Sequence, residues 1–258
     1  MTEPIEIIVI SLPRSTARRE QAARQLDATG LPWSFLDAVD GAKQKFFPPE
    51  YDQRKQLRYF GYHLNPAQIG CFLSHRRAWE KCVQTGRLTL VFEDDFHLEP
   101  NFSAALALAV TKVAEFDLLK LQGINQNKFK ILEDHGAQQL VRFYRDPLGA
   151  TAYLMTPAAA RVLLEKSRTF YAPIDEFMHY DWIHRRKILA LLPYAVTTTG
   201  APSITDSFGR NRASRREKWL VKIRRLPRSA AKKFYRLRMF PALYFTRTKK
   251  FPATAPVN

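Results

Sequence analysis

The segment 88–96 constrains the fold most, because extended structure runs directly into three consecutive carboxylates. Residues 88–92 are apolar or β-branched, which is typical of a buried strand. Glu93, Asp94 and Asp95 come next, and an unpaired carboxylate is very unfavourable in an apolar interior. The strand therefore has to leave the sheet at this point, and the three acids are expected at its carboxyl edge.

Ligands of open α/β sheets bind at that carboxyl edge. Clustered carboxylate oxygens suit Mg²⁺ or Mn²⁺, and a phosphate group can complete the coordination. The triplet on its own also fits a solvated turn that carries acids without a ligand. The sequence therefore offers a divalent metal site at residues 93–95, with this simpler interpretation beside it.

Strands and helices alternate through residue 206, which predicts one layered α/β domain over residues 1–206. Residues 123–138 are polar and are expected to form a loop. The expected strands are 5–12, 33–39, 88–92, 117–122, 139–144, 149–155 and 188–192, and the expected helices follow residues 13–16, 65, 101 and 156.

Charge divides the chain into two parts. The net charge is +17, yet residues 1–206 hold 25 Lys and Arg against 23 acids, while residues 207–258 hold 16 Lys and Arg against one acid. The region 207–258 is therefore predicted to be a basic tail with an anionic partner.

Apolar residues recur at helical spacing within this tail, in two short segments. Basic amphipathic helices with aromatic residues lie in membrane interfaces, so we expect the tail to bind an anionic membrane surface. A disordered, solubilising tail is the alternative. The apolar positions are Trp219, Leu220, Ile223 and Leu226, followed by Ala230, Phe234 and Leu237.

The two cysteines indicate a reducing compartment. Cys71 and Cys82 fall on one expected helix, about 16 Å apart, which is too far for a disulfide. Both are expected to be small buried apolar residues. No signal peptide or membrane-spanning run is evident, so a cytoplasmic protein, peripheral on the inner face of the plasma membrane, is expected. His75 lies on the same helix, and we expect it at most to position other site residues, without a direct catalytic role.

Two further groups of residues carry possible chemistry. Arg14 and Arg18 follow the first strand, where guanidinium groups and backbone N–H groups can hold a phosphate or a base, but they also fit a solvated helix face. Asp175 and Glu176 follow Pro173 and can supply a catalytic base or cap the next helix.

Five blocks of the sequence resemble those of glycosyltransferase family 25 in order and spacing. They are residues 9–12 with Arg14, Arg18 and Arg19, residues 69–75 with Trp79, and residues 91–95, 149–153 and 173–175. The resemblance covers residues 5–206, although Asp206 lies in a segment that matches the family only loosely. It implies a GT-A-like, Rossmann-like mixed sheet flanked by helices. It also implies a UDP-sugar donor, a glycan or lipid-linked glycan acceptor of the lipopolysaccharide type, and hexose transfer with inversion.

The chemistry of such a transfer fits what single residues offer. Mn²⁺ or Mg²⁺ is expected on Asp95 and Glu93, with Asp94 as the alternative second ligand, and it would neutralise the leaving phosphate. Asp175 is the expected base, and Glu176 is second. The expected donor-binding residues are Leu12, Arg14, Arg18 and Asp94.

Three other functions remain open at this point. A nucleic-acid-binding protein would explain the pI near 10.1, but no helix-turn-helix, zinc or RNA-recognition pattern is present, so no specific nucleic acid is expected. A metal-dependent hydrolase or nuclease could use the same acids. A transferase fold that has lost its activity could serve as a partner subunit.

Overall fold

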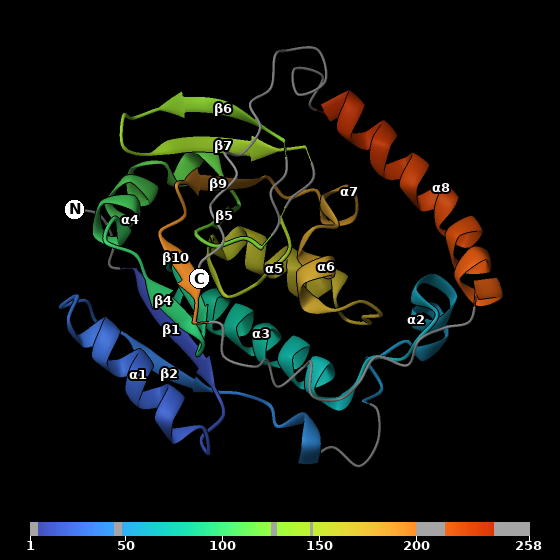
Figure 1. The fold of residues 1–258 in the computed structure, drawn as a ribbon, viewed down its shortest axis with the longest axis horizontal. Helices are drawn as coiled ribbons and strands as arrows, with labels where there is room; N and C mark the ends of the chain where they lie inside the picture. Colours follow the sequence, from blue (N-terminus) through green and yellow to red (C-terminus); the bar gives the residue numbers. More distant parts are fainter. Residues whose placement is uncertain (1–4, 44–47, 125–127, 145–146, 200–214, 240–258) are drawn as a thin grey trace.

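The computed structural model describes residues 5–43, 48–124, 128–144, 147–199 and 215–239, and in the last range the side chains of residues 219–238 (Figure 1). Asp206 lies outside these ranges. The centre of the fold is an eight-stranded mixed sheet with the order β2-β1-β3-β8-β5-β9-β7-β6. The strands are β1 (Glu6–Ser11), β2 (Ser34–Asp37), β3 (Thr89–Glu93), β5 (Leu118–Lys120), β6 (Phe129–Asp134), β7 (Gln139–Phe143), β8 (Ala152–Met155) and β9 (Ile188–Leu192).

Strand direction places the ends of β3 and β8 side by side. β1 is parallel to both β2 and β3, whereas β8 runs antiparallel between β3 and β5. The end of β3 therefore meets the start of β8, where the Glu93 N–H donates to the Thr151 carbonyl at 2.9 Å. A second, two-stranded sheet pairs β4 (Phe96–Leu98) with β10 (Val196–Thr198).

Helices cover both faces of the large sheet, so the predicted α/β fold is confirmed. Val91 and Tyr153 lie on one face, in a core with Phe72 and Trp79. Leu90 and Phe92 point to the other face, because successive side chains of a strand alternate. The helices are α1 (Thr16–Asp27), α2 (Gln53–Phe60), α3 (Pro66–Thr85), α4 (Phe102–Thr111), α5 (Pro157–Lys166), α6 (Ile174–Met178), α7 (Asp181–His184) and α8 (Arg215–Met239).

The longest of the helices on the sheet, α3, begins and ends where its sequence predicts. Asn65 accepts a hydrogen bond from the Gln68 N–H at 2.8 Å, and the Gln68 side chain accepts from the Asn65 N–H at 3.0 Å. Gly86 ends the helix at a φ of 67°, a left-handed conformation that glycine adopts without strain.

The expected loop at 123–138 is wrong, because β6 lies within it. Phe129 is buried and packs against Phe143 of β7 with ring centroids 5.7 Å apart, while Leu132 is 41% exposed. β6 is an edge strand with one face in water, and its polar residues look like those of a loop. It forms a hairpin with β7, a pairing predicted for residues 139–144 without its partner strand.

The tail also differs from the expected two short segments. Residues Arg215–Met239 form the single helix α8, with Pro227 inside it. α8 packs against α2 and α7, along one side of the molecule (Figure 1). Among the helices of the described ranges, none has the length and apolar character needed to span a bilayer.

Candidate active site

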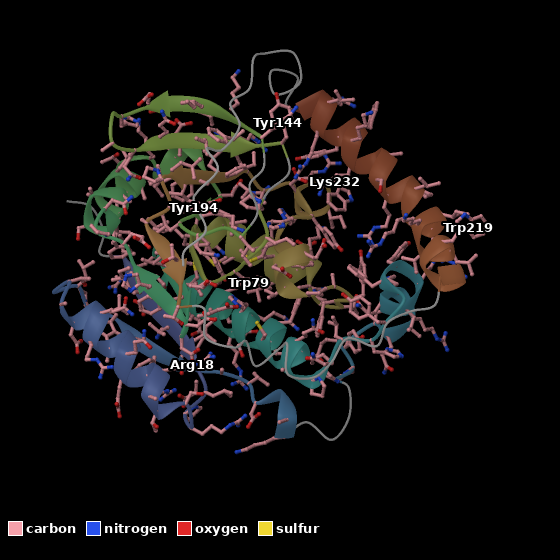
Figure 2. All side chains as sticks on the ribbon, viewed as in Figure 1. Arg18, Trp79, Tyr144, Tyr194, Trp219 and Lys232 are labelled. Carbon is pink, nitrogen blue, oxygen red and sulfur yellow. The ribbon has the colours of Figure 1, made fainter. Side chains whose placement is uncertain are left out.

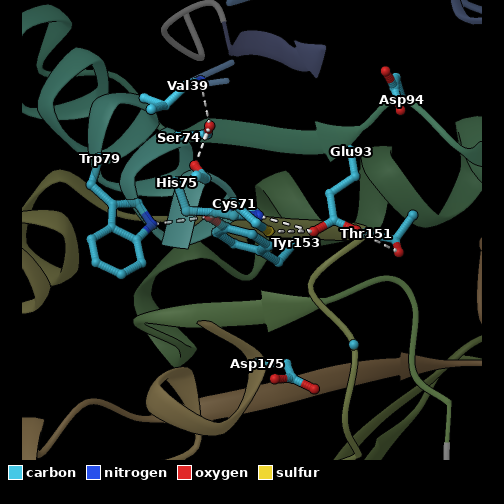
Figure 3. A network of polar contacts seen from close by, with 12 residues as sticks. Val39, Cys71, Ser74, His75, Trp79, Glu93, Asp94, Thr151, Tyr153 and Asp175 are labelled. Atoms are coloured by element: carbon cyan, nitrogen blue, oxygen red, sulfur yellow. Dashed lines mark hydrogen bonds and ion pairs between the residues drawn. The ribbon is translucent and has the colours of Figure 1, made fainter. Parts of the chain in front are cut away.

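The acidic triplet lies where β3 leaves the sheet, as its sequence predicts. Glu93 is the last residue of β3, and Asp94 and Asp95 form the turn into β4. The three side chains have different surroundings. Figure 3 shows Glu93 within a network that includes His75 and Thr151, while Asp94 points elsewhere.

Glu93 accepts three side-chain hydrogen bonds. His75 Nε2 lies 3.1 Å and Cys71 Sγ 3.5 Å from Oε1, and Thr151 Oγ1 lies 3.3 Å from Oε2. Burial by itself raises the pKa of Glu93, but the hydrogen bonds from its three donors outweigh burial and hold the pKa below its ordinary value. Glu93 is therefore an ionised carboxylate whose oxygens are already engaged inside the protein.

A buried relay continues from His75 into the core. Trp79 Nε1 donates to Tyr153 Oη at 2.9 Å, and Tyr153 Oη lies 2.9 Å from His75 Nδ1. An indole nitrogen only donates, so Tyr153 satisfies both neighbours when its hydroxyl proton points at Nδ1. His75 then carries its proton on Nε2 and donates it to Glu93.

The remaining residues of the block 69–75 fit α3 closely against the chain after β2. A Cβ on Gly70 would lie 2.5 Å from the Val39 carbonyl oxygen, so only glycine fits there without a shift. Ser74 Oγ donates to the Gly70 carbonyl at 2.7 Å and accepts from the Val39 N–H at 2.8 Å. The block 69–75 thus positions the backbone at Val39 and also the side chains that donate to Glu93.

Asp94 is tied to the first strand and helix. Ser11 Oγ, at the end of β1, donates to Asp94 Oδ2 at 2.6 Å, and Arg18 of α1 donates to Oδ1 at 3.0 Å. The structure therefore brings together two of the predicted donor-binding residues, Arg18 and Asp94. Ser11 was missed by sequence reasoning, and its place at the carboxyl end of a buried strand was the available signal.

Asp95 differs from both of its neighbours. Its Oδ1 is buried and has no hydrogen-bond partner among the described residues. Burial and the negative charge of Glu93 raise its pKa to about 6, against the opposing charge of Arg18. A buried carboxylate oxygen that lacks a donor is a good ligand for a cation.

The fourth carboxylate comes from α6. Asp175 Oδ1 accepts from the Glu176 N–H at 2.9 Å in the first turn of this five-residue helix. Burial raises the Asp175 pKa, the charge of Glu93 adds to this effect, and Lys120 opposes it. The charges of Asp175 and Asp95 also act on Cys71, so both acids lie within electrostatic range of the Glu93 network.

The sequence comparisons identify the family of this chain. A family profile described as Glycosyltransferase family 25 (LPS biosynthesis protein) matches residues 4–178. The chain belongs to glycosyltransferase family 25. The resemblance of the five sequence blocks is thereby confirmed, and family membership supports a glycosyltransferase.

Similar proteins of this family carry two kinds of name. The chain is 32% identical over 186 residues to a probable inactive glycosyltransferase 25 family member 3 of Bos taurus, which covers 67% of this chain and 31% of that protein. It is 30% identical over 197 residues to a glycosyltransferase 25 family member of Aedes aegypti, with 67% and 30% covered. This family 25 chain thus spans about a third of the length of these relatives.

A solved structure of mannose-1-phosphate geranyltransferase from Thermus thermophilus aligns with a TM-score of 0.35 and 10% identity. The alignment covers 74% of this chain and 73% of that one.

Lys120 is a buried residue of this family 25 site that sequence reasoning missed. Its ammonium group donates to the carbonyls of Pro147 and Gly149, the latter at 2.8 Å, and lies 3.3 Å from His179 Nε2. Burial and the nearby positive charge of Lys120 hold the His179 pKa well below its ordinary value. Lys120 is thus a buried cation that fixes the chain just before β8, and its charge acts on Asp175.

The other two predicted donor-binding residues lie near the end of β1. Leu12 follows the strand directly and is half-buried. Arg14 forms a two-contact ion pair with Asp40, in which the second N–O distance is 3.1 Å. Arg14 therefore contacts Asp40, whereas Arg18 contacts the acidic turn.

Cys71 corrects the expectation of a purely apolar role, since its thiol donates to Glu93. Ligand atoms of Cys71, His75 and Glu93 lie within 4.8 Å of one another, a spacing compatible with a metal ion. These groups are already hydrogen-bonded together, and burial and Glu93 raise the pKa of the Cys71 thiol well above its ordinary value. The cluster therefore acts as a hydrogen-bonded support. Both Cys71 and Cys82 are free thiols.

Proposed function

We propose that this chain transfers a hexose from a UDP-sugar to a hydroxyl group of a glycan acceptor, with inversion at the anomeric carbon. The observation that carries this proposal is the buried Oδ1 of Asp95, which has no partner among the described residues, in a family 25 fold. The charge of Glu93 acts on Asp95 and also on a second carboxylate of raised pKa, Asp175. Asp95 suits a metal ion as its ligand, and Asp175 suits the role of a base that accepts a proton.

The residues of the acidic turn fit a divalent cation. Asp95 offers a carboxylate oxygen without a donor, and a cation there would remove the charge repulsion that raises its pKa. Mn²⁺ or Mg²⁺ at this position would neutralise charge that develops on the leaving diphosphate. Glu93 is already engaged by three donors, so we propose Asp95 as the principal protein ligand and Glu93 as the residue that fixes the turn.

Arg18 and Asp94 form the proposed donor edge. Ser11 and Arg18 hold Asp94 in one orientation. Its carboxylate can therefore accept a hydrogen bond from a hydroxyl group of the UDP-sugar without first reorganising. Leu12 offers an apolar side chain next to them. Arg14 can exchange its exposed contact with Asp40 for a phosphate oxygen.

Asp175 is the proposed base. Inversion needs one direct attack by the acceptor hydroxyl, and a carboxylate of raised pKa accepts the hydroxyl proton more readily than an ordinary one. Glu176 N–H occupies Asp175 Oδ1, so Oδ2 is the oxygen proposed to take the proton. Glu176 is the alternative base.

Nucleotide sugars tested without an acceptor provide the experiment. The purified protein would be mixed with UDP-, GDP- and CMP-sugars in Mn²⁺, in Mg²⁺ and in EDTA, and released nucleotide would be measured. We expect release from a UDP-hexose that needs the metal and stops with EDTA. Release from free nucleotides or phosphodiesters in place of UDP-sugars would indicate a hydrolase and overturn the proposal.

A second candidate is a family 25 fold without transfer activity, favoured by the names of the mammalian relatives. Metal-dependent UDP binding with no turnover of any donor, in the presence of a glycan acceptor mixture, would support this candidate over the first.

A further inference from the structure

The outer side of α8 carries a continuous apolar stripe. Its residues recur every three or four positions and fall within about 80° of one another on an ideal helix. Trp219 is 60%, Leu226 63% and Phe234 67% exposed, and Figure 2 shows Trp219 at the outer edge of the molecule. The stripe consists of Trp219, Ile223, Leu226, Ala230, Phe234 and Leu237.

The opposite side of α8 is already occupied by the protein. The Arg228 guanidinium lies over the rings of Tyr59, Tyr180 and Tyr171, at 4.4, 4.9 and 5.0 Å from their centroids. Arg236 forms a buried ion pair with Asp181 at 2.9 Å. Because these contacts fix the rotation of the helix, the apolar stripe is held away from the body.

Basic side chains flank the stripe. Lys222 and Lys233 lie on one side of it and Arg224 and Arg238 on the other, all of them exposed. Residues 218–258 contain no Asp or Glu at all. An apolar stripe between rows of cations matches the interface of a bilayer that carries anionic headgroups.

A groove beside the helix adds positive charge to the same region. It has a volume of about 530 Å³, lies between α2 and α8, and is lined by Arg54, Leu57, Arg58 and Arg224. Arg54 and Arg58 are one helical turn apart and both exposed. Three guanidinium groups around one opening suit the phosphate of a lipid headgroup.

We propose that α8 and this arginine groove form a docking surface for an anionic lipid bilayer, with the stripe in the interface and the groove on the headgroups. Nucleic acid is the weaker fit, because binding to phosphates would leave the stripe in water. The lipid surface needs no sugar nucleotide, so this proposal and the proposed transfer reaction can fail separately.

Vesicle flotation of the full-length chain tests the proposal. The vesicles would contain phosphatidylcholine with or without phosphatidylglycerol, and the stripe variant would combine Trp219→Gln, Ile223→Gln, Leu226→Gln and Phe234→Gln. Its matched control, Val113→Gln with Leu132→Gln, changes apolar residues that are each 41% exposed on other elements. We expect the stripe variant to lose binding to anionic vesicles and the control to keep it.

A charge variant separates the groove from the stripe. Arg54→Gln, Arg58→Gln and Arg224→Gln should weaken binding roughly 100-fold, at roughly 5-fold for each basic residue near the surface, and should flatten its salt dependence. The control removes three exposed charges elsewhere, through Arg24→Gln, Lys81→Gln and Lys128→Gln. Circular dichroism and thermal unfolding would show that each variant keeps its fold.

Trp219 offers a direct signal. Its emission should shift to the blue on anionic vesicles, and Trp219→Phe should abolish the shift while binding persists. Vesicle binding that is equal in the stripe variant and the wild type would overturn the proposal. So would binding to duplex DNA, without binding to vesicles, that the charge variant loses.

Discussion

Glu93 and Asp95 are two residues apart, yet their carboxylates have opposite surroundings. Glu93 meets donors from Cys71 and His75 of α3 and from Thr151 before β8, and its pKa lies below the ordinary value. Asp95, by contrast, has a buried oxygen without a donor among the described residues, and its pKa is raised to about 6. We call these the supported side and the open side.

This difference separates a residue that stabilises the structure, Glu93, from a residue that can bind a ligand, Asp95. A carboxylate whose oxygens are satisfied stabilises its surroundings and gains little from a ligand. A carboxylate left buried and unsatisfied makes the free protein less stable, and a cation or a proton can relieve that penalty. The open side should therefore control activity, and the supported side should control stability and the geometry of the turn.

Asp95→Asn should produce the largest loss of activity. Removal of a charged group that stabilises the transition state lowers the rate on the order of 10³-fold, and here metal-dependent UDP binding should disappear as well. Donor turnover and UDP titration with Mn²⁺ check both effects. A folded Asp95→Asn protein that keeps manganese-dependent UDP affinity would place the metal elsewhere.

The same substitution should make the metal-free protein more stable. Asp95 has a folded pKa of about 6 against an ordinary 3.8, so the native state is penalised once the carboxyl ionises. The difference corresponds to at most about 3 kcal/mol. This gain should be complete above pH 6, shrink as the pH falls, and vanish below 3.8. Urea unfolding across this range measures it, and a gain independent of pH would contradict the assignment.

Asp175→Asn should come next in size. Loss of a general base lowers kcat roughly 10²-fold or more, while donor affinity stays nearly unchanged because the substitution keeps the shape of the side chain. Glu176→Gln is the control, since its position in α6 is adjacent. If Glu176→Gln instead carries the loss in kcat, the base is Glu176.

The open side was predictable from sequence, whereas most of the supported side was not. A buried strand that ends in three acids fixes the place of Asp95, because the carboxylates cannot enter the core. No local pattern pairs Glu93 with Thr151, since that contact depends on β8 lying antiparallel beside β3. Tyr153 and Lys120 are polar groups within strands, and their roles appear only when the sheet order brings partners to them.

The same reasoning explains the errors at the edges of the fold. Three of the six residues of β6 are charged, and a bulge between Ile131 and Glu133 interrupts its alternation, so its sequence indicates a loop. The apolar pattern of the tail indicates two short segments, yet α8 continues through both of them and through Pro227, a residue that usually interrupts helices. The partners of its inner basic residues, among them Tyr59, Tyr180 and Asp181, are distant in sequence and could not be predicted.

Tyr153→Phe should affect the supported side mainly through stability. The change removes the hydroxyl between Trp79 and His75 and leaves both ring nitrogens buried without it, which costs about 1–3 kcal/mol. A smaller loss of activity, roughly 10-fold, should follow because His75 is less well oriented toward Glu93. Urea unfolding and donor turnover measure the two effects.

Tyr51→Phe is the matched control for Tyr153→Phe. Tyr51 Oη accepts from the buried Leu64 N–H at 2.8 Å, away from the acidic turn. This variant should lose stability and keep its turnover. Equal activity losses in the two variants would mean that the relay has no specific effect on the site.

Lys120→Met should give the smallest effect, a shift in pH dependence. The ammonium of Lys120 lowers the Asp175 pKa against burial and the charge of Glu93, so its removal should raise that pKa further. Asp175 must be ionised to accept a proton, and therefore the acid limb of kcat/KM should move to higher pH. Lys120→Arg keeps the charge and should keep the acid limb in place even if it disturbs the carbonyls of Pro147 and Gly149. An unshifted limb in Lys120→Met, with activity reduced equally at every pH, would show that Lys120 only holds the chain before β8. Lys120 would then belong to the supported side, which controls stability, while Asp175 would belong to the open side, which controls activity.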